Sequence, residues 1–193
     1  MLRRFLHDRK GLSAIEFALI APLMALLYLG LASLTLAMMA ERRSGHAAAI
    51  VGDLVAQQAQ AINIGILDDI IAVGRAIVSP GTPRQPGDPL VPPSLSIRIT
   101  NVQADAAGAP RVVWCRTAGT GFTQTANGAT PPVFSPGLIL AGESIIQTEL
   151  KYNYQSLAND LVPSLPAVVK FSEVQYHRPR RGRVIACSNC PAG

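Results

Sequence analysis

The sequence predicts an α+β protein. A long N-terminal transmembrane helix should continue into a helical segment, followed by a small outer domain with an antiparallel sheet of about four strands. Three observations predict this arrangement. Residues 12–40 are an apolar run in which Glu16 is the only charged residue. Residues 62–77 repeat isoleucine and valine at three- and four-residue steps, which is typical of an amphipathic helix. Beyond residue 95, apolar and polar residues alternate as they do in strands.

The apolar run is long enough to cross a lipid bilayer as a helix. Residues 12–40 are 29 in number, whereas about 20 apolar residues suffice for a span. Pro22 lies inside the run and removes one backbone hydrogen bond, which predicts a kink. The basic residues that precede the run favour a cytoplasmic N-terminus; they are Arg3, Arg4, Arg9 and Lys10. We therefore expect one pass through the inner membrane, with the C-terminal domain in the periplasm.

The remaining sequence divides by composition. The stretch "SPGTPRQPGDPLVPPS" contains six prolines and two glycines, which cannot sustain a helix or the interior of a sheet. Strand-like segments follow it, and in one of them a single face is predicted to carry Ile146, Thr148, Leu150, Tyr152 and Tyr154. We predict a basic leader, a membrane helix, a helical stalk with a second helix, a proline-rich linker and a β-rich outer domain, at residues 1–11, 12–40, 41–78, 79–94 and 95–193.

Residue types that would support catalysis or cofactor binding are sparse. The three histidines, His7, His46 and His177, lack metal-ligand spacing, and no nucleophile motif or phosphate-binding glycine loop is present. His177 stands beside the arginine-rich segment 177–183, so we expect a solvated side chain there. Contact of that segment with an acidic partner or with lipid headgroups is the weaker interpretation. The sequence predicts no enzyme, no cofactor, no metal and no small-molecule substrate.

The charge distribution argues against a nucleic-acid partner. The net charge is +5, but the first ten residues carry three of those five charges. No stripe of lysine and arginine interleaved with aromatic residues follows in the rest of the chain. We therefore predict no binding to nucleic acid.

The three cysteines fit an oxidising compartment. Cys187 and Cys190 have the C-x-x-C spacing, but a redox motif requires a helix N-terminus in a thioredoxin-like fold, and a zinc site requires a fourth ligand. The preferred interpretation is a structural disulfide from Cys115 to either Cys187 or Cys190. A local Cys187–Cys190 bond is the next alternative. The third cysteine would be free or would pair between subunits.

Glu16 is unusual in an apolar helix, because a carboxylate in the bilayer costs about 2.5–3.5 kcal/mol. One explanation is a place near the cytoplasmic interface, where the side chain can reach water. Alternatively, a cut after Gly11 would give Leu12 a new α-amino group one helical turn from Glu16. The two opposite charges would then neutralise each other within one helix or between neighbouring helices, and so set the axial register of packed subunits.

The segment "KGLSAIEF" resembles the processing site of type IV prepilins. Gly11 would precede the cut, Leu12 would be the new first residue, and Glu16 and Phe17 would occupy positions five and six of the mature chain. The longer stretch "GLSAIEFALIAP" more closely resembles the TadE-like family, which are pseudopilins of the bacterial Tad (tight adherence) pilus. The related TadG-like proteins resemble carriers of a von Willebrand-type domain, for which this sequence shows no D-x-S-x-S motif. The specific resemblance covers residues 9–35.

This resemblance implies a structural role without catalysis. A prepilin peptidase would cut after Gly11, and Leu12, Glu16 and Phe17 would serve assembly. The chain would be a minor pilin or pseudopilin of a Tad-type (type IVb) pilus involved in surface adherence. Its implied partners are the inner membrane, the peptidase, other pilin or pseudopilin subunits and the Tad assembly machinery, and its implied locations are the inner membrane and the extracellular pilus. One alternative is an uncleaved, membrane-anchored periplasmic binding or adhesion module. A secreted form cut near residues 36–40 is disfavoured, because the apolar run is too long for a signal peptide.

Overall fold

The computed structural model describes most of the chain after the N-terminal leader, and side chains within the first helix from Ala14 onwards. The predicted leader therefore falls largely outside the described residues. The described residues are 10–59, 61–81, 85, 87–135, 137–156 and 167–190. The elements in chain order are α2 (Lys10–Ala56), β1 (Ala61–Ile62), α3 (Ile64–Val78), β2 (Leu95–Ala104), β3 (Pro110–Ala118), β4 (Ser144–Gln155), β5 (Val168–His177) and β6 (Ala186–Cys187).

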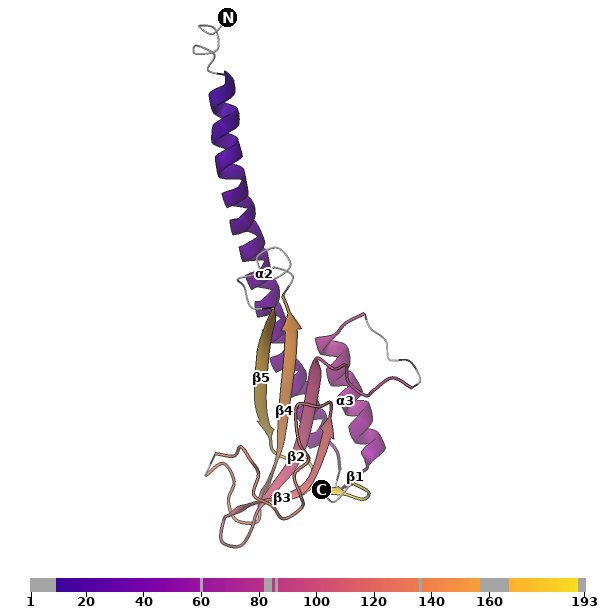
Figure 1. Ribbon diagram of the computed structural model, residues 1–193. Helices are drawn as coiled ribbons and strands as arrows, with labels where there is room; N and C mark the ends of the chain where they lie inside the picture. Colours follow the sequence, from indigo (N-terminus) through magenta and orange to yellow (C-terminus); the bar gives the residue numbers. More distant parts are fainter. Residues whose placement is uncertain are drawn as a thin grey trace, which may run out of the picture.

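The helix α2 has two parts with different surroundings. It is 47 residues long, or about 70 Å at 1.5 Å per residue, and its N-terminal part projects away from the rest of the molecule (Figure 1). Pro22 lies inside it without ending the helix, and the kink at Pro22 stays a prediction. The C-terminal part of α2 packs into the outer domain through its buried residues, Ala40, Ser44, Ala47, Ala48, Val51, Val55 and Ala56.

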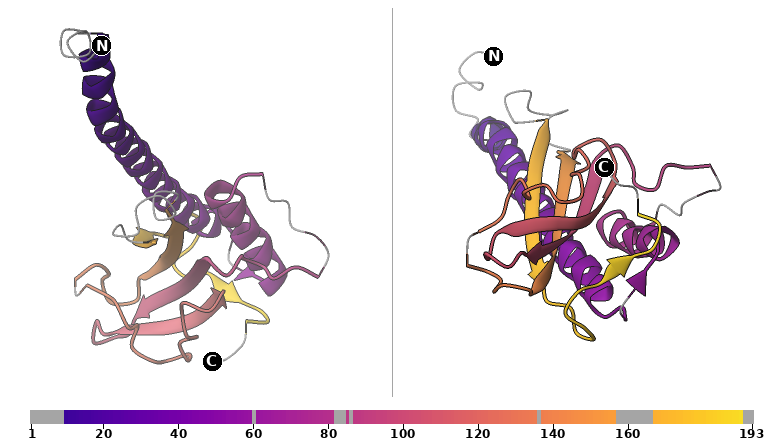
Figure 2. Two further views of the ribbon diagram at one scale, coloured as in Figure 1. Left: turned by 45° about the horizontal axis from the view of Figure 1, so that its top comes forward. Right: turned by 90° about the horizontal axis from the view of Figure 1, so that it is seen from below.

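The outer domain is built on a four-stranded sheet in the order β3-β2-β4-β5, and each neighbouring pair is antiparallel. Both helices lie on one face of this sheet, and the loop between β3 and β4 lies over part of the other (Figure 2). A second, two-stranded parallel sheet joins β1 to β6. The predicted α+β class, with a long apolar helix and an antiparallel sheet of four strands, is therefore confirmed.

The main core lies between the helices and the sheet. Leu95, Ile97 and Ile99 of β2 and Ile146 and Leu150 of β4 are all fully buried there. These residues alternate along their strands, as the sequence pattern predicts. The helix α3 supplies Leu67, Ile70, Ile71 and Val78 to the same cluster, and it begins where the Asn63 side chain accepts a hydrogen bond from the Ile66 N–H.

The sheet face opposite the helices is also buried over much of its area. The loop between β3 and β4 places Phe122 over the guanidinium of Arg98, at 4.7 Å from ring centroid to Cζ. Gln147 donates a hydrogen bond to the Val133 carbonyl at 2.7 Å. As a result, β4 is buried on both faces from Ser144 to Leu150, although its sequence alternates like a strand with one solvated face.

A glycine allows α2 to lie directly against the sheet. A Cβ atom added to Gly52 would lie 2.8 Å from Cε1 of His177 and 2.9 Å from Oγ1 of Thr148. By contrast, a Cβ atom at Gly45 would meet nothing closer than 3.7 Å, from the Glu173 side chain. The helix and strands β4 and β5 are thus in close contact at Gly52 and have ordinary spacing at Gly45.

We expect Gly52→Ala to destabilise the protein and Gly45→Ala to be neutral or stabilising. Both changes gain up to about 1 kcal/mol of helix propensity, but only the first forces atoms apart, at a cost of about 1–3 kcal/mol. The measurement is thermal unfolding of the full chain in detergent, followed by circular dichroism. Equal melting temperatures for the two variants would contradict the close contact at Gly52.

Candidate assembly helix

The N-terminal part of α2 exposes apolar side chains all around its axis. Leu19 is 77% exposed, Tyr28 is 74% exposed and Phe17 is 72% exposed, and most of their neighbours as far as Met39 are also exposed. Among the described residues, no other element covers this surface. A helix that is apolar all round is stable only when lipid or other helices surround it, so this segment needs a partner outside the chain.

The residues predicted for processing and assembly lie together at the start of α2. Gly11 and Leu12 fall in its first turn, because the helix begins at Lys10. Glu16 and Phe17 follow one turn later, and both are exposed. Residues four apart stand one above the other on a helix, so residues 12 and 16 share a face. Within the described part of the chain, the Glu16 carboxylate has no hydrogen bond or ion pair.

These features define a class of protein: a chain with one N-terminal helix fit for single-pass membrane anchoring, attached to a small α+β domain. By length and composition, the segment Ala14–Ala56 can cross a membrane. Residues 11–52 match the family described as TadE-like protein, which confirms the resemblance found at the start of the helix. The match lies within α2 and does not extend to the sheet of the outer domain. Comparisons with curated proteins and with solved structures found no match.

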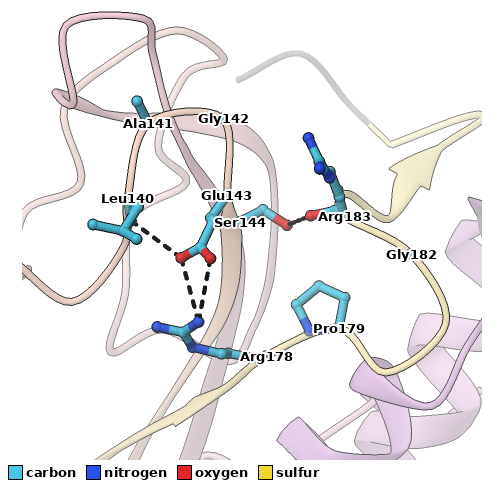
Figure 3. A pocket seen from close by; sticks show the side chains of 9 residues that line it. All are labelled: Leu140, Ala141, Gly142, Glu143, Ser144, Arg178, Pro179, Gly182 and Arg183. Atoms are coloured by element: carbon cyan, nitrogen blue, oxygen red, sulfur yellow. Dashed lines mark hydrogen bonds and ion pairs between the residues drawn. The ribbon is translucent and has the colours of Figure 1, made fainter.

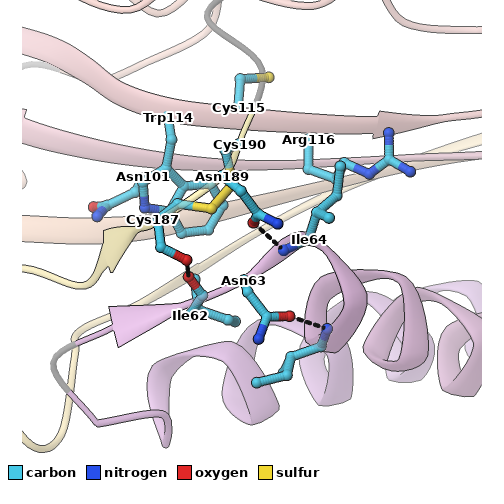
Figure 4. The surroundings of a disulfide bond; sticks show 12 residues. Ile62, Asn63, Ile64, Asn101, Trp114, Cys115, Arg116, Cys187, Asn189 and Cys190 are labelled. Carbon is cyan, nitrogen blue, oxygen red and sulfur yellow. Dashed lines mark hydrogen bonds between the residues drawn. A yellow bond between two sulfur atoms is a disulfide. The ribbon is translucent and has the colours of Figure 1, made fainter.

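The structure corrects the preferred disulfide. Cys187 is bonded to Cys190, with the two Cα atoms 5.6 Å apart, and Cys115 is free and buried. The preferred partner, Cys115, was wrong because adjacent residues of a strand point to opposite faces. Trp114 faces the C-terminal segment, whereas Cys115 faces the other side, where its Sγ atom accepts a hydrogen bond from Thr100 at 3.6 Å (Figure 4).

The disulfide closes a loop that is docked on both the sheet and α3. The Ile185 carbonyl accepts hydrogen bonds from Trp114 Nε1 at 2.6 Å and from Asn101 Nδ2 at 2.7 Å. Asn189, inside the disulfide loop, accepts a hydrogen bond from the Ile64 N–H at 2.8 Å (Figure 4). Cys187 ends β6, and neither bonded cysteine begins a helix. The C-x-x-C pair is thus a structural link at the first turn of α3 and lacks the arrangement of a redox site.

Outside α2, a cavity in the outer domain is the other candidate site among the described residues. They contain no cluster of histidine, cysteine, aspartate and glutamate that could hold a metal ion. A cavity of about 330 Å³ lies between the β3–β4 loop and the turn after β5 (Figure 3). Its charged groups are Glu143, which forms an ion pair with Arg178 at 3.3 Å, and Arg183. The Ser144 hydroxyl in this cavity donates a hydrogen bond to the Arg183 carbonyl and is not paired with a base among the described residues.

The arginine-rich segment 177–183 is partly engaged within the chain. Arg178 pairs with Glu143, and Arg180 pairs with Asp53 at the C-terminal end of α2. The Arg180 N–H also donates to the Ala56 carbonyl at 2.9 Å, so Arg180 places a positive charge where the helix macrodipole is negative. Arg181 and Arg183 are exposed. The segment is therefore both a helix cap and a solvated turn.

His177 is more buried than its sequence context predicts. Its ring packs against Gly52, and its Nδ1 atom is buried without a hydrogen-bond partner among the described residues. Burial lowers the pKa of His177, the charge of Asp53 raises it, and the charge of Arg180 lowers it, for a net decrease. The cause is the close contact of β5 with α2, which takes the ring partly out of water.

We expect the protein to lose stability as the pH falls below about 6.5, through the titration of His177. Because the folded state has the lower pKa, the unfolded chain binds more protons in this range, so acid favours unfolding. The loss begins near the ordinary histidine pKa of about 6.5 and is complete below the folded value. The measurement is the melting temperature of the full chain in detergent between pH 8 and pH 5, for wild type and His177→Gln.

His46→Gln is the matched control, since His46 is exposed on α2. Protonation of carboxylates changes the melting temperature of all three proteins at low pH. The quantity to compare is therefore the slope of melting temperature against pH. His177→Gln should show a flatter slope than the other two proteins. Identical slopes in all three would refute the assignment to His177.

Proposed function

We propose that this chain is a minor pilin or pseudopilin of a bacterial Tad-type (type IVb) pilus involved in surface adherence. It enters the inner membrane with its N-terminus in the cytoplasm and its outer domain in the periplasm. A prepilin peptidase then cuts after Gly11. The observation that carries the proposal is the TadE-like match over residues 11–52, on a helix whose apolar surface is exposed from Ile15 to Met39.

The start of the helix supports a role for the cut in assembly. Before cleavage, Glu16 is an unpaired carboxylate in an apolar segment, at a cost of about 2.5–3.5 kcal/mol if it lies within the bilayer. Cleavage creates a positive α-amino group at Leu12, one helical turn away. An ion pair between these groups, within one helix or between neighbours, offsets the cost and favours one axial register. Phe17 extends the apolar contact beside it.

The rest of the chain fits a displayed structural domain. Residues 12–40 form the membrane and assembly segment, residues 41–78 the stalk and second helix, residues 79–94 the linker, and residues 95–193 the outer domain. Because α2 contributes Ala47, Val51 and Val55 to the domain core, helix and domain move together. Assembly through the helix would therefore fix the orientation of each domain along the filament.

N-terminal sequencing of the mature chain, purified from its native membranes, tests the proposal. Leu12 as the first residue supports the pilin function. Met1 as the first residue would instead favour an uncleaved anchor for a periplasmic binding or adhesion module, and Glu41 would indicate a secreted protein. Gly11→Val should block the cut, whereas Gly30→Val is the matched control, because a Cβ atom at Gly30 meets nothing within 4 Å.

A further inference from the structure

The outer domain extends back along α2 toward the membrane segment. Strands β4 and β5 run beside the helix, and their adjoining ends, near residues 155 and 168, point toward its N-terminal part (Figure 1). Two contacts give the alignment: His177 lies against Gly52, and Glu173 lies 3.7 Å from a Cβ atom placed on Gly45. Earlier residues of β5 therefore lie beside earlier residues of α2, closer to the apolar run.

The start of β5 reaches the level of the apolar run itself. Val168 precedes Glu173 by five residues, which in an extended strand is about 16 Å. On the helix, that distance corresponds to roughly ten residues. Counted from Gly45, Val168 is thus level with the last turns of the run that ends at Ala40. Ala37 is half-buried and Ala40 is buried, which agrees with protein packed beside these turns.

The length of the run places its last turn in the headgroup layer. As a helix, residues 12–40 measure about 43 Å, which matches the roughly 40–45 Å of a bilayer including both headgroup regions. The hydrocarbon core accounts for only about 30 Å of this. About 6–7 Å is left for the headgroup layer at each end, which is a little more than one helical turn. The last turn before Glu41 therefore lies among headgroups, and the ends of β4 and β5 reach the inner edge of that layer.

The chemistry of the strand ends fits that layer. We name Tyr154, Gln155, Val168, Val169 and Lys170 the β4–β5 end. Val168 and Lys170 are exposed, and Tyr154 is half-buried; tyrosine and lysine are typical of membrane interfaces, where an apolar body and a polar tip are both accommodated. The outer edge of β5 has no partner strand among the described residues, so its backbone needs the water of the headgroup layer and excludes the hydrocarbon core.

The charges nearby are mainly positive. Arg42 and Arg43 are exposed on α2, close to the level of the β4–β5 end along the helix. Glu41 and Glu173 oppose these two arginines and Lys170. Burial and the neighbouring Tyr154 raise the pKa of Tyr152, and the charge of Arg43 lowers it, so Arg43 lies close to this end of the sheet. Among the described residues here, three cations face two carboxylates, which favours contact with an anionic surface.

We propose that the β4–β5 end rests in the headgroup layer of the membrane that α2 crosses and prefers anionic headgroups. Before assembly, the outer domain is then held at the membrane surface by two contacts, the helix and the strand ends. The arginine-rich turn 177–183 follows the opposite end of β5, so it faces away from the lipid. This contact depends on the membrane span alone and is independent of pilus function and of cleavage.

A fluorescent label at residue 168 tests the contact. The native thiols do not interfere, because Cys187 and Cys190 are bonded and Cys115 is buried. Val168→Cys is labelled with an environment-sensitive dye, and the full chain is reconstituted at one copy per nanodisc of phosphatidylcholine and phosphatidylglycerol. A nitroxide attached to the lipid headgroup should quench this label at least threefold more than a label at Arg181→Cys, at the other end of the domain. Equal quenching at the two positions would overturn the proposal.

Two further measurements decide the partner and its charge. The double variant Arg42→Glu, Lys170→Glu should lose most of the quenching at residue 168 in discs with phosphatidylglycerol, whereas Arg181→Glu should not. Unchanged quenching in the double variant would refute the anionic preference. The other possible partner of this surface is a second copy of the chain. It is tested in nanodiscs that hold two copies, one of them spin-labelled at residue 168. Quenching between the copies without quenching by lipid would make this surface a subunit contact and would overturn the proposal.

Discussion

Replacing Glu16 by alanine is expected to leave the cut after Gly11 intact and to reduce surface piliation by tenfold or more. Under the proposed function, the peptidase would act on the peptide bond before Leu12, whereas the carboxylate would act after the cut, as the partner of the new α-amino group. Without it, a positive charge remains unpaired in an apolar helix bundle, and the preferred axial register is lost. Glu16→Gln should fail in the same way, since an amide carries no charge.

The measurement combines N-terminal sequencing of the variant with counting of pili by electron microscopy. Glu41→Ala is the matched control, because Glu41 is an exposed carboxylate on the same helix, outside the apolar run. It should leave both processing and piliation unchanged. Normal piliation by Glu16→Ala would sink the register hypothesis, and loss of cleavage would show that Glu16 serves the peptidase instead.

Glu149→Ala is expected to lower the free energy of unfolding by about 3–5 kcal/mol, the cost of breaking a buried ion pair. Arg98 and Glu149 face each other on β2 and β4. They form two hydrogen bonds, from Nε to Oε2 at 2.6 Å and from Nη2 to Oε1 at 2.8 Å. Their side chains are only 7% and 5% exposed. Removing the carboxylate leaves the guanidinium buried beneath Phe122 with one remaining bond, to the Thr123 carbonyl.

The test is chemical denaturation of the full chain in detergent micelles, followed by the fluorescence of Trp114, which is the only tryptophan. The control Glu143→Ala breaks the exposed pair with Arg178 and should cost about 1 kcal/mol or less. The double variant Arg98→Met, Glu149→Leu should recover most of the loss, because it removes both charges together. A Glu149→Ala protein within 1 kcal/mol of wild type would contradict this account.

The parts of the fold that follow from local pattern were predictable. The helix α2 follows from a continuous apolar run, and β2 and β4 follow from strict alternation. The short strands β1 and β6 have two residues each, which is too few for any periodicity. The burial of Arg98 and Glu149 depends on a loop that folds over them from more than twenty residues away, and no local pattern encodes such a cover.

The location of the candidate site on the first helix could be predicted, because its residues are close together in the sequence. Gly11, Leu12, Glu16 and Phe17 form one short motif, and the structure gathers them in the first two turns of α2. The disulfide required knowledge of which face of β3 meets the C-terminal segment, and this depends on Trp114 pointing toward Ile185. His177 appeared solvated because its sequence neighbours are arginines. Its burial comes from Gly52, over a hundred residues earlier.

Because α2 and the sheet share one core, a rotation of the helix about its axis also rotates the outer domain. Ala47, Val51 and Val55 are fully buried in the outer domain, so the domain turns whenever the helix turns about its own axis. A slip of one residue in helix register shifts a subunit by only about 1.5 Å along the axis but rotates it by about 100°. A charge pair at residues 12 and 16 would thus decide, from the far end of the molecule, which side of each domain faces outward.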